Sequence, residues 1–94
     1  MIIDSHQHFW YYQPSMNSWI TDSMSVLRQD FLASDLEVVL MAHKVDGCIA
    51  VQANQSEEET LFLLDLASNH TFIKGVVGWV DLQDAAVEER LIFF

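Results

Sequence analysis

The stretch Met1-Ile2-Ile3-Asp4-Ser5-His6-Gln7-His8 decides which fold the sequence predicts. Ile2 and Ile3 are the branched apolar residues of a short buried strand, and the polar residues after them mark its exit. Because side chains alternate along a strand, His6 and His8 should point the same way and converge just beyond the strand's end. Neutral imidazole is the commonest protein ligand for zinc. The pair is therefore a candidate for half of a metal site.

The charge balance disfavours two classes of partner. The chain has 94 residues and a formal net charge of −10, with only four basic residues. Binding to nucleic acid or to anionic lipid relies on clusters of lysine and arginine, so we expect no nucleic acid and no membrane among the partners. The apolar fraction of 51% predicts one small folded domain.

Cys48 is the single cysteine, so no internal disulfide can form, and its apolar surroundings predict a small buried hydrophobe rather than a nucleophile. A chain without disulfides is typical of a reducing compartment. No basic stretch precedes the first strand, and no apolar run approaches the ~20 residues of a membrane span. We therefore expect a cytoplasmic protein.

Strand and helix patterns alternate along the rest of the chain. Two more buried strands are predicted at 48–53 and 73–82, and helices are predicted from Ser34, over 56–69 and from Asp84. Ser34 with Glu37 and Ser56 with Glu59 have the spacing of capping boxes. Alternation of this kind is typical of a parallel sheet with right-handed crossovers, so the fold class is α/β.

The segment Phe9 to Phe31 is a long irregular connection, rich in aromatic residues, in which 21–27 is predicted to form a short helical turn. Long loops in compact domains are often lids or binding loops. Its aromatic residues could equally seal one end of the core. The sequence leaves lid and plug open.

Polar or aromatic residues follow each predicted strand. His6 and His8 follow the first, Gln52 the second, and Trp79 and Asp81 the third. The carboxyl ends of parallel strands open on one face, where ligands bind in such folds. These residues should therefore gather around one site.

Several stretches resemble one family in the order in which they occur. Ile3 to Trp10 resembles the opening of the amidohydrolase superfamily, in the amidohydrolase-2 branch that includes sugar lactonases of the L-fuconolactonase and L-rhamnonolactonase type. Four further stretches resemble the same branch, and they are 27–32, 47–53, 56–60 and 75–82. The resemblance spans nearly the whole chain.

This resemblance implies a TIM-barrel hydrolase that uses a divalent metal, with zinc the first candidate, for attack of water on a lactone or ester-like carbonyl. On the matching positions, His6 and His8 would be metal ligands. The substrate-binding candidates are Trp10, Gln52, Trp79 and Asp81.

The chain departs from the family in length. It has three strand–helix units, whereas an eight-unit barrel takes about 250 residues. We therefore expect residues 1–94 to be a partial barrel domain that ends after the third unit and is inactive alone, with no catalytic residue of its own and with a metal site that can lose its ion. Unpaired outer strands predict a homo-oligomer, in which two copies could bring four imidazoles together.

Two other hypotheses remain open. The chain could be a free-standing metal-binding or oligomerising module. Alternatively, the two histidines could be satisfied by aspartate or backbone partners and bind no metal.

Overall fold

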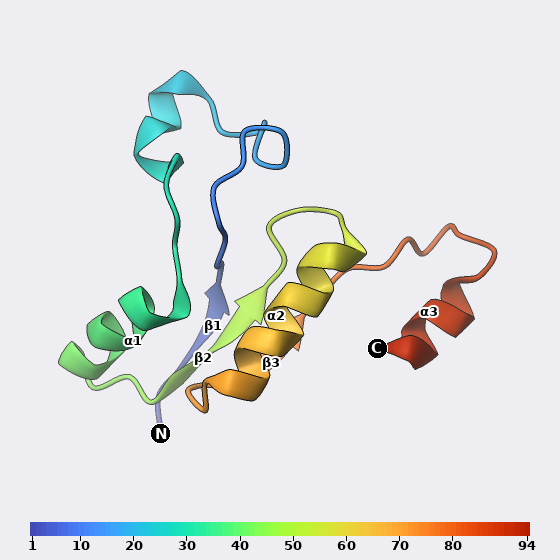
Figure 1. Ribbon diagram of the computed structural model, residues 1–94. Coiled ribbons are helices and arrows are strands. Elements are labelled where there is room, and N and C mark those ends of the chain that lie inside the picture. Colours follow the sequence, from blue (N-terminus) through green and yellow to red (C-terminus); the bar gives the residue numbers. More distant parts are fainter.

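Three parallel strands and the helices that follow them form the centre of the molecule (Figure 1). The computed structural model describes residues 1–94. In chain order its elements are β1 (Ile3–Gln7), a 3-10 helix η1 (Asp22–Leu27), α1 (Ala33–Ala42), β2 (Gly47–Val51), α2 (Glu57–Asn69), β3 (Ile73–Val77) and α3 (Val87–Phe93). The predicted α/β class is confirmed.

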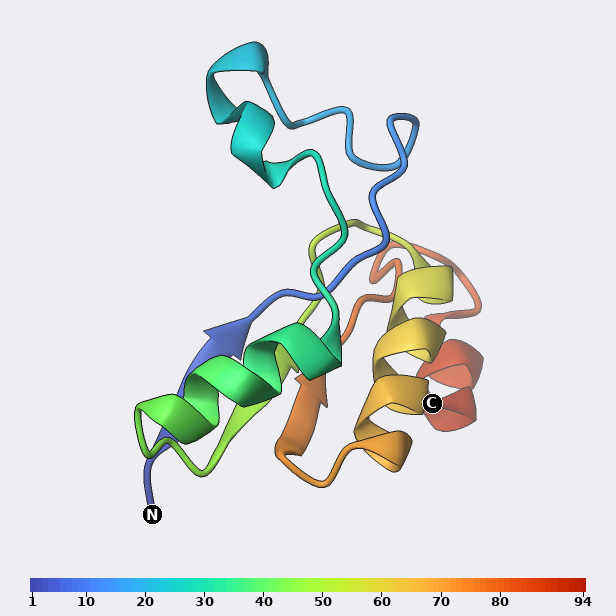
Figure 2. The same ribbon diagram turned by 60° about the vertical axis from the view of Figure 1, so that its left-hand side comes forward.

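The sheet has the strand order β1-β2-β3, and both neighbouring pairs are parallel. Ile3 lies beside Gly47, and Cys48 lies beside Ile73. Helices α1 and α2 lie on the same face of the sheet (Figure 2). All three strands therefore end at the same edge, as the alternating pattern predicted.

The core lies between the sheet and its helices. Cys48 and Ala50 point into it from β2 and are fully buried. Leu63 of α2 and Phe72, just before β3, pack in the same cluster. Phe9 closes the cluster at the end of β1. The expectation that Cys48 behaves as a small hydrophobe is confirmed.

Helix α2 begins as predicted and ends at the predicted residue. Oγ of Ser56 accepts a hydrogen bond from the backbone N–H of Glu59 at 3.1 Å. Three glutamates, 57 to 59, lie in the first turn, where the helix dipole favours negative charge. The second half of the predicted capping box is absent, because the Glu59 carboxylate bonds other backbone groups.

Helix α1 begins one residue before the predicted cap. Ser34 lies inside the helix, and the prediction that it caps the helix with Glu37 is wrong. Instead, the carboxylate of Asp35 accepts a hydrogen bond from the N–H of Leu32 at 3.2 Å. An aspartate reaches back over one turn here and takes the role predicted for Glu37.

The carboxyl end of α1 is closed by a Schellman motif. Val45 N–H donates to the Leu40 carbonyl at 2.9 Å, and Lys44 N–H donates to the Met41 carbonyl at 3.2 Å. Lys44 has a φ of 58°, the left-handed conformation that this motif requires and that glycine adopts most easily. The motif turns the chain directly into β2.

The second and third strands are shorter than predicted. β2 ends at Val51, so Gln52 and Ala53 lie beyond it, and β3 ends at Val77 rather than at residue 82. The third strand stops because Thr60 Oγ1 accepts from the N–H of Trp79 at 2.8 Å and donates to its carbonyl at 2.9 Å. The backbone of Trp79 is thus bonded to α2 instead of to a neighbouring strand.

The first strand is longer than expected and runs through His6.

The third helix begins at Val87, later than the predicted Asp84 cap. The Asp84 side chain accepts from the N–H of Ala86 at 2.7 Å, in a turn that precedes the helix.

The segment between β1 and α1 projects beyond the carboxyl ends of the strands (Figure 1). Its base is closed by two backbone hydrogen bonds between Trp10 and Phe31, at 2.9 and 2.8 Å. The predicted helical turn is η1. Phe9 at the base seals the core, whereas the tip stands away from it, so plug and projecting loop are different parts of one segment.

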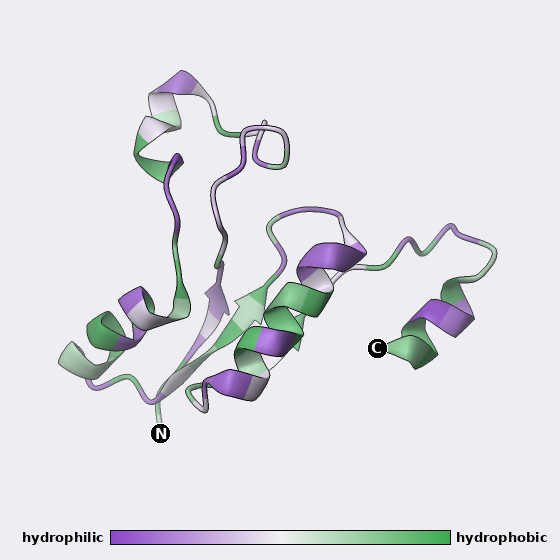
Figure 3. Ribbon diagram, in the orientation of Figure 1, coloured by the Kyte–Doolittle hydropathy of each residue, from purple (hydrophilic) through white to green (hydrophobic).

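Apolar residues on the outer helices α1 and α3 remain exposed, and Figure 3 colours part of each of these helices green. Val38 and Met41 of α1 and Ile92 and Phe93 of α3 are all exposed. Single apolar residues are ordinary on protein surfaces, but each of these two helices exposes several. No helix has both the length and the apolar character needed to cross a bilayer.

Candidate metal centre and the strand ends

His6 lies at a bulge in β1, and His8 lies one residue beyond the end of the strand. The register between β1 and β2 shifts between Asp4 and Gln7. Oδ1 of Asp4 accepts a hydrogen bond from the backbone N–H of His6 at 3.0 Å. Its Oδ2 accepts one from the side-chain Nε2 of Gln7 at 2.5 Å. These two hydrogen bonds, the one from His6 first, lower the pKa of Asp4 below its usual value. The carboxylate thereby holds the backbone that carries the imidazoles.

The imidazoles lie side by side, as the alternation of the strand predicts. Their ring centroids are 4.9 Å apart, and the planes cross at 78°. Nδ1 of His8 lies 2.9 Å from the carbonyl oxygen of Val51, the last residue of β2. A carbonyl oxygen only accepts hydrogen bonds, so Nδ1 carries a proton, and in the neutral ring Nε2 keeps its lone pair. This is the arrangement of a histidine oriented to ligate a metal through Nε2.

The pair is not a complete metal site in this chain. No group of three or more His, Cys, Asp or Glu side chains is close enough to hold an ion. Structural zinc sites have four protein ligands, and catalytic sites have three. The donor chemistry of two imidazoles fits zinc, but the number of ligands does not.

Gln52 lies one residue beyond β2, next to the carbonyl that orients His8. Its Oε1 is buried and has no hydrogen-bond partner. A buried acceptor without a partner is costly, and such atoms often mark places where a ligand or water completes the bond. Of the four predicted substrate-binding residues, Gln52 has the clearest unused polar group.

Trp10, Trp79 and Asp81 do not gather in one pocket. Trp10 is buried at the base of the projecting segment, and its indole N–H donates to the Gln29 carbonyl at 2.9 Å. Trp79 and Asp81 line a separate shallow depression. The Asp81 carboxylate is exposed and accepts from the N–H of Gln83 at 2.9 Å.

Cys48 cannot serve as a nucleophile. Burial raises the pKa of its thiol to about 11, and the negative charge of Asp4 adds to the effect. The remaining histidines, 43 and 70, lie at the carboxyl ends of α1 and α2.

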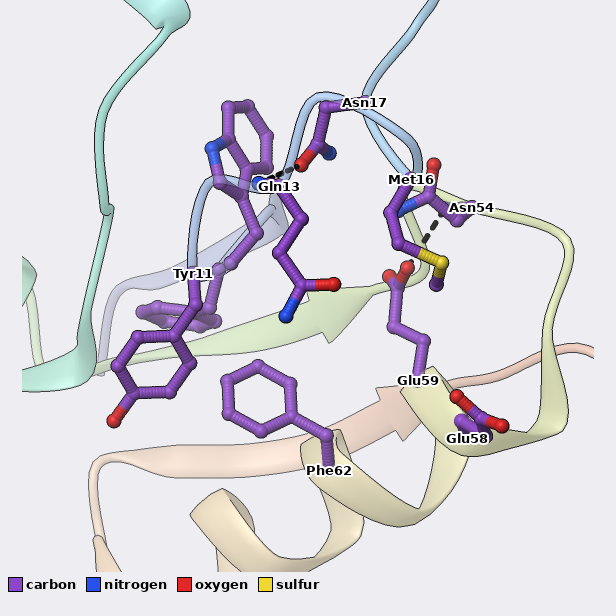
Figure 4. Close-up of a pocket in the computed structure, with 10 residues that line it drawn as sticks. Tyr11, Gln13, Met16, Asn17, Asn54, Glu58, Glu59 and Phe62 are labelled. Atoms are coloured by element: carbon purple, nitrogen blue, oxygen red, sulfur yellow. Dashed lines mark hydrogen bonds between the residues drawn. The ribbon is translucent and has the colours of Figure 1, made fainter.

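One pocket was not predicted from the sequence. It has a volume of about 200 Å³ and lies between the projecting segment and the first turns of α2 (Figure 4). Asn17 and Glu59, both buried, line it. One signal pointed to Glu59: it lies four residues before Leu63, so the two share the buried face of α2.

Comparison with known proteins shows which proteins the chain resembles. No protein-family model matches the chain. An L-fucono-1,5-lactonase from Burkholderia multivorans (strain ATCC 17616 / 249) is 44% identical over 89 residues, which are 95% of this chain and 30% of that protein. An L-fucono-1,5-lactonase from Burkholderia ambifaria is 40% identical over 81 residues, or 86% of this chain and 28% of that protein.

Two solved structures show the same resemblance. A crystal structure of an amidohydrolase from Burkholderia multivorans with bound zinc has a TM-score of 0.96 and 41% identity, covering 100% of this chain and 33% of that one. A second structure, with bound HEPES, has a TM-score of 0.94 and 42% identity, over 99% of this chain and 32% of that one. The chain is homologous to the amino-terminal part of amidohydrolases.

The amidohydrolase fold explains the topology. The three parallel βα units are those of a TIM barrel, and the resemblance predicted from the sequence is confirmed. The chain spans about 30% of the length of the curated relatives that it matches. In a TIM barrel the carboxyl ends of the strands form the active-site face, which is where His8 and Gln52 lie here.

Proposed function

We propose that the chain is the first part of a metal-dependent amidohydrolase-type hydrolase that acts on a sugar lactone or a similar cyclic ester. Residues 1–94 would form one partial barrel domain. The observation that carries the proposal is the hydrogen bond between Nδ1 of His8 and the Val51 carbonyl, which leaves Nε2 free to bind a metal beside the His6 ring. The zinc in the Burkholderia multivorans amidohydrolase and the names of the lactonase relatives support it.

His6 and His8 would hold a divalent metal, with zinc the first candidate. When bound, such an ion polarises a carbonyl or lowers the pKa of a water molecule. The chain's own groups position the ligands. The Val51 carbonyl fixes the tautomer and direction of His8, and the Asp4 carboxylate fixes the backbone at His6.

Four residues are proposed to contact the substrate. Gln52 would accept a hydrogen bond from a substrate hydroxyl through its unpaired Oε1. Trp10 would present only its apolar surface, because its indole N–H is already bonded. Trp79 and Asp81 lie in the separate depression after β3 and would contact a more distant part of the substrate.

The chain alone would be inactive. Two imidazoles leave a metal without its remaining protein ligands, and no His, Cys, Asp or Glu completes the set. We therefore expect weak zinc binding and no lactone hydrolysis above the spontaneous rate.

Calorimetric titration with zinc tests the metal site. His6→Ala and His8→Ala should each abolish binding. His43→Ala should not, because His43 lies at the end of α1. Zinc binding that survives in the double variant His6→Ala/His8→Ala would overturn the proposal. Lactone hydrolysis at ordinary enzyme rates would overturn the expectation that the chain is inactive.

A second candidate is a metal-binding or oligomerising module without catalysis. The observation that favours it is the exposed apolar surface on α1 and α3, together with the two open edges of the sheet. Under either function we propose a homo-oligomer, and a location in the cytoplasm, for which the single buried thiol is suited. Native mass spectrometry with and without zinc separates the two. Tight zinc at a fixed ratio per chain, with a change of oligomeric state, would support the module.

A further inference from the structure

Three consecutive backbone N–H groups fix the chain where it leaves β2. The N–H of Gln52 donates to the carbonyl of Val77, the last residue of β3, at 2.8 Å. The N–H groups of Ala53 and Asn54 both donate to the carboxylate of Glu59, the second of them at 2.8 Å (Figure 4). The first bond holds the end of β2 to the sheet, and the next two hold it to the first turn of α2.

These bonds determine the direction of the Val51 carbonyl. The C=O of Val51 and the N–H of Gln52 belong to one trans peptide unit, so they point in opposite directions. Because the N–H points to β3, the carbonyl points to the other side of β2, where β1 lies. There it accepts the hydrogen bond from Nδ1 of His8 at 2.9 Å. One peptide unit therefore connects the third strand to the imidazole, and hydrogen bonds in such a chain strengthen one another.

The Glu59 carboxylate has no cationic partner. The residue is 8% exposed, and neither of the two ion pairs of the chain includes it. A buried carboxylate is costly unless hydrogen bonds compensate for the lost water. Both of its oxygens are bonded to the same two adjacent residues, directly after Gln52. The buried acid therefore acts on the exit of β2.

We propose that Glu59 is a positioning residue for the site at the strand ends, and this inference rests on the proposed roles of His8 and Gln52. By holding the two N–H groups after Gln52, Glu59 keeps the preceding peptide in the one orientation that gives His8 the Nδ1–H tautomer. The same peptide sets the place of the Gln52 side chain. Without the carboxylate the peptide can rotate, its carbonyl leaves His8, and the neutral ring regains both tautomers.

Long-range ¹H–¹⁵N correlation spectra of the metal-free chain, labelled at histidine, test the proposal at mildly alkaline pH, where imidazole is neutral. In the unaltered chain His8 should carry its proton on Nδ1. Glu59→Gln offers one acceptor oxygen to two N–H groups and should lower the ratio of Nδ1–H to Nε2–H about three- to tenfold, as expected for the loss of one hydrogen bond. Glu59→Asp keeps the charge but is one methylene shorter, so it should have the same effect.

Two control variants separate positioning from stability. Glu58→Gln changes the neighbouring exposed acid and should leave the tautomer of His8 unchanged. Ile73→Val lowers stability at the amino end of β3, opposite to the strand ends that carry the site, and should leave the tautomer unchanged as well. The signals of His43, at the end of α1, are the internal reference.

The proposal is wrong if folded Glu59→Gln and Glu59→Asp both keep the tautomer ratio of the unaltered chain. If neither variant folds, amide hydrogen exchange in the unaltered chain decides. The N–H groups of Ala53 and Asn54 should exchange at least about tenfold more slowly than that of exposed Gln55, and equal rates would overturn the proposal.

Zinc titration of the unaltered chain distinguishes this inference from the proposed function. A chain that binds no zinc but changes its His8 tautomer in Glu59→Gln would contradict the metal site and support the positioning role. A chain that binds zinc through His6 and His8 with the same affinity and the same tautomer in Glu59→Gln would contradict the positioning role alone. If both hold, zinc affinity should fall about three- to tenfold in Glu59→Gln and stay unchanged in Glu58→Gln.

Discussion

The carboxylate of Glu59 accepts a hydrogen bond from the backbone N–H of Asn54 at 2.8 Å, and its second oxygen accepts from Ala53. The first turn of α2 thereby fixes the loop that leaves β2. That loop begins at Gln52 and follows directly from the carbonyl that orients His8. A single buried acid therefore connects the helix, the pocket and the edge of the proposed metal centre.

Glu59→Gln should lower the free energy of unfolding by about 1–3 kcal/mol, because an amide offers one acceptor where two N–H groups need two. Chemical denaturation measures the change. Glu58→Gln is the matched control, since Glu58 is exposed, and it should stay within about 0.5 kcal/mol. Equal effects of the two substitutions would show that the two backbone bonds contribute little.

Gly78→Ala should destabilise the chain by about 1–3 kcal/mol. A Cβ at this position would lie 2.5 Å from Cγ2 of Thr60, on the buried side of α2. The double variant Gly78→Ala/Thr60→Ser removes that methyl group, keeps the hydroxyl and should recover part of the loss. Gly75→Ala, whose Cβ would meet only a side-chain methyl of Ile49 at 3.3 Å, should cost much less. Thermal melts of the four proteins provide the comparison.

Lys44→Gly should stabilise the chain by about 0.5–1 kcal/mol, because Lys44 adopts a φ of 58° at the end of α1. Glycine accepts this conformation without steric cost, and the two Schellman hydrogen bonds remain. Lys74→Gly is the control: Lys74 is also exposed but lies inside β3, where glycine should destabilise. Denaturation midpoints should therefore move in opposite directions, and a shared direction would contradict the assignment.

Cys48 should make stability fall in alkaline solution. Its pKa is raised from 9.0 to about 11 in the folded chain, so the unfolded chain loses its proton first. The resulting stability is fully present below pH 9 and is lost as the pH rises toward 11, by about 2–3 kcal/mol in all. Cys48→Ala should show a flatter dependence of unfolding free energy over this range. Parallel curves for the two proteins would mean that the thiol titrates normally.

The sequence predicted the class and order of elements because the signals were local. Apolar runs, such as 48–51, marked strands, and the Ser56 cap marked the start of α2. The ends of strands were predicted less well, because long-range bonds determine them. Nothing near Trp79 shows that its backbone will bond to Thr60, 19 residues away.

The histidine pair could be predicted because its geometry depends only on the period of a strand. The tautomer of His8 could not be predicted, since it depends on a carbonyl 43 residues away. The sequence predicts a capping role for Glu59, because a glutamate three residues after a serine has the spacing of a capping box. Its two backbone partners appear only when the loop after β2 is folded against it.

The placement of β1 at the margin of the sheet has a consequence for metal affinity. The imidazoles stand on an outer strand, so a further ligand can approach from another molecule without displacing any strand of this one. Ion uptake and self-association would then be thermodynamically linked, and the apparent zinc affinity would rise with protein concentration. Zinc titrations at several protein concentrations would test whether donors from a second copy of the chain complete the site.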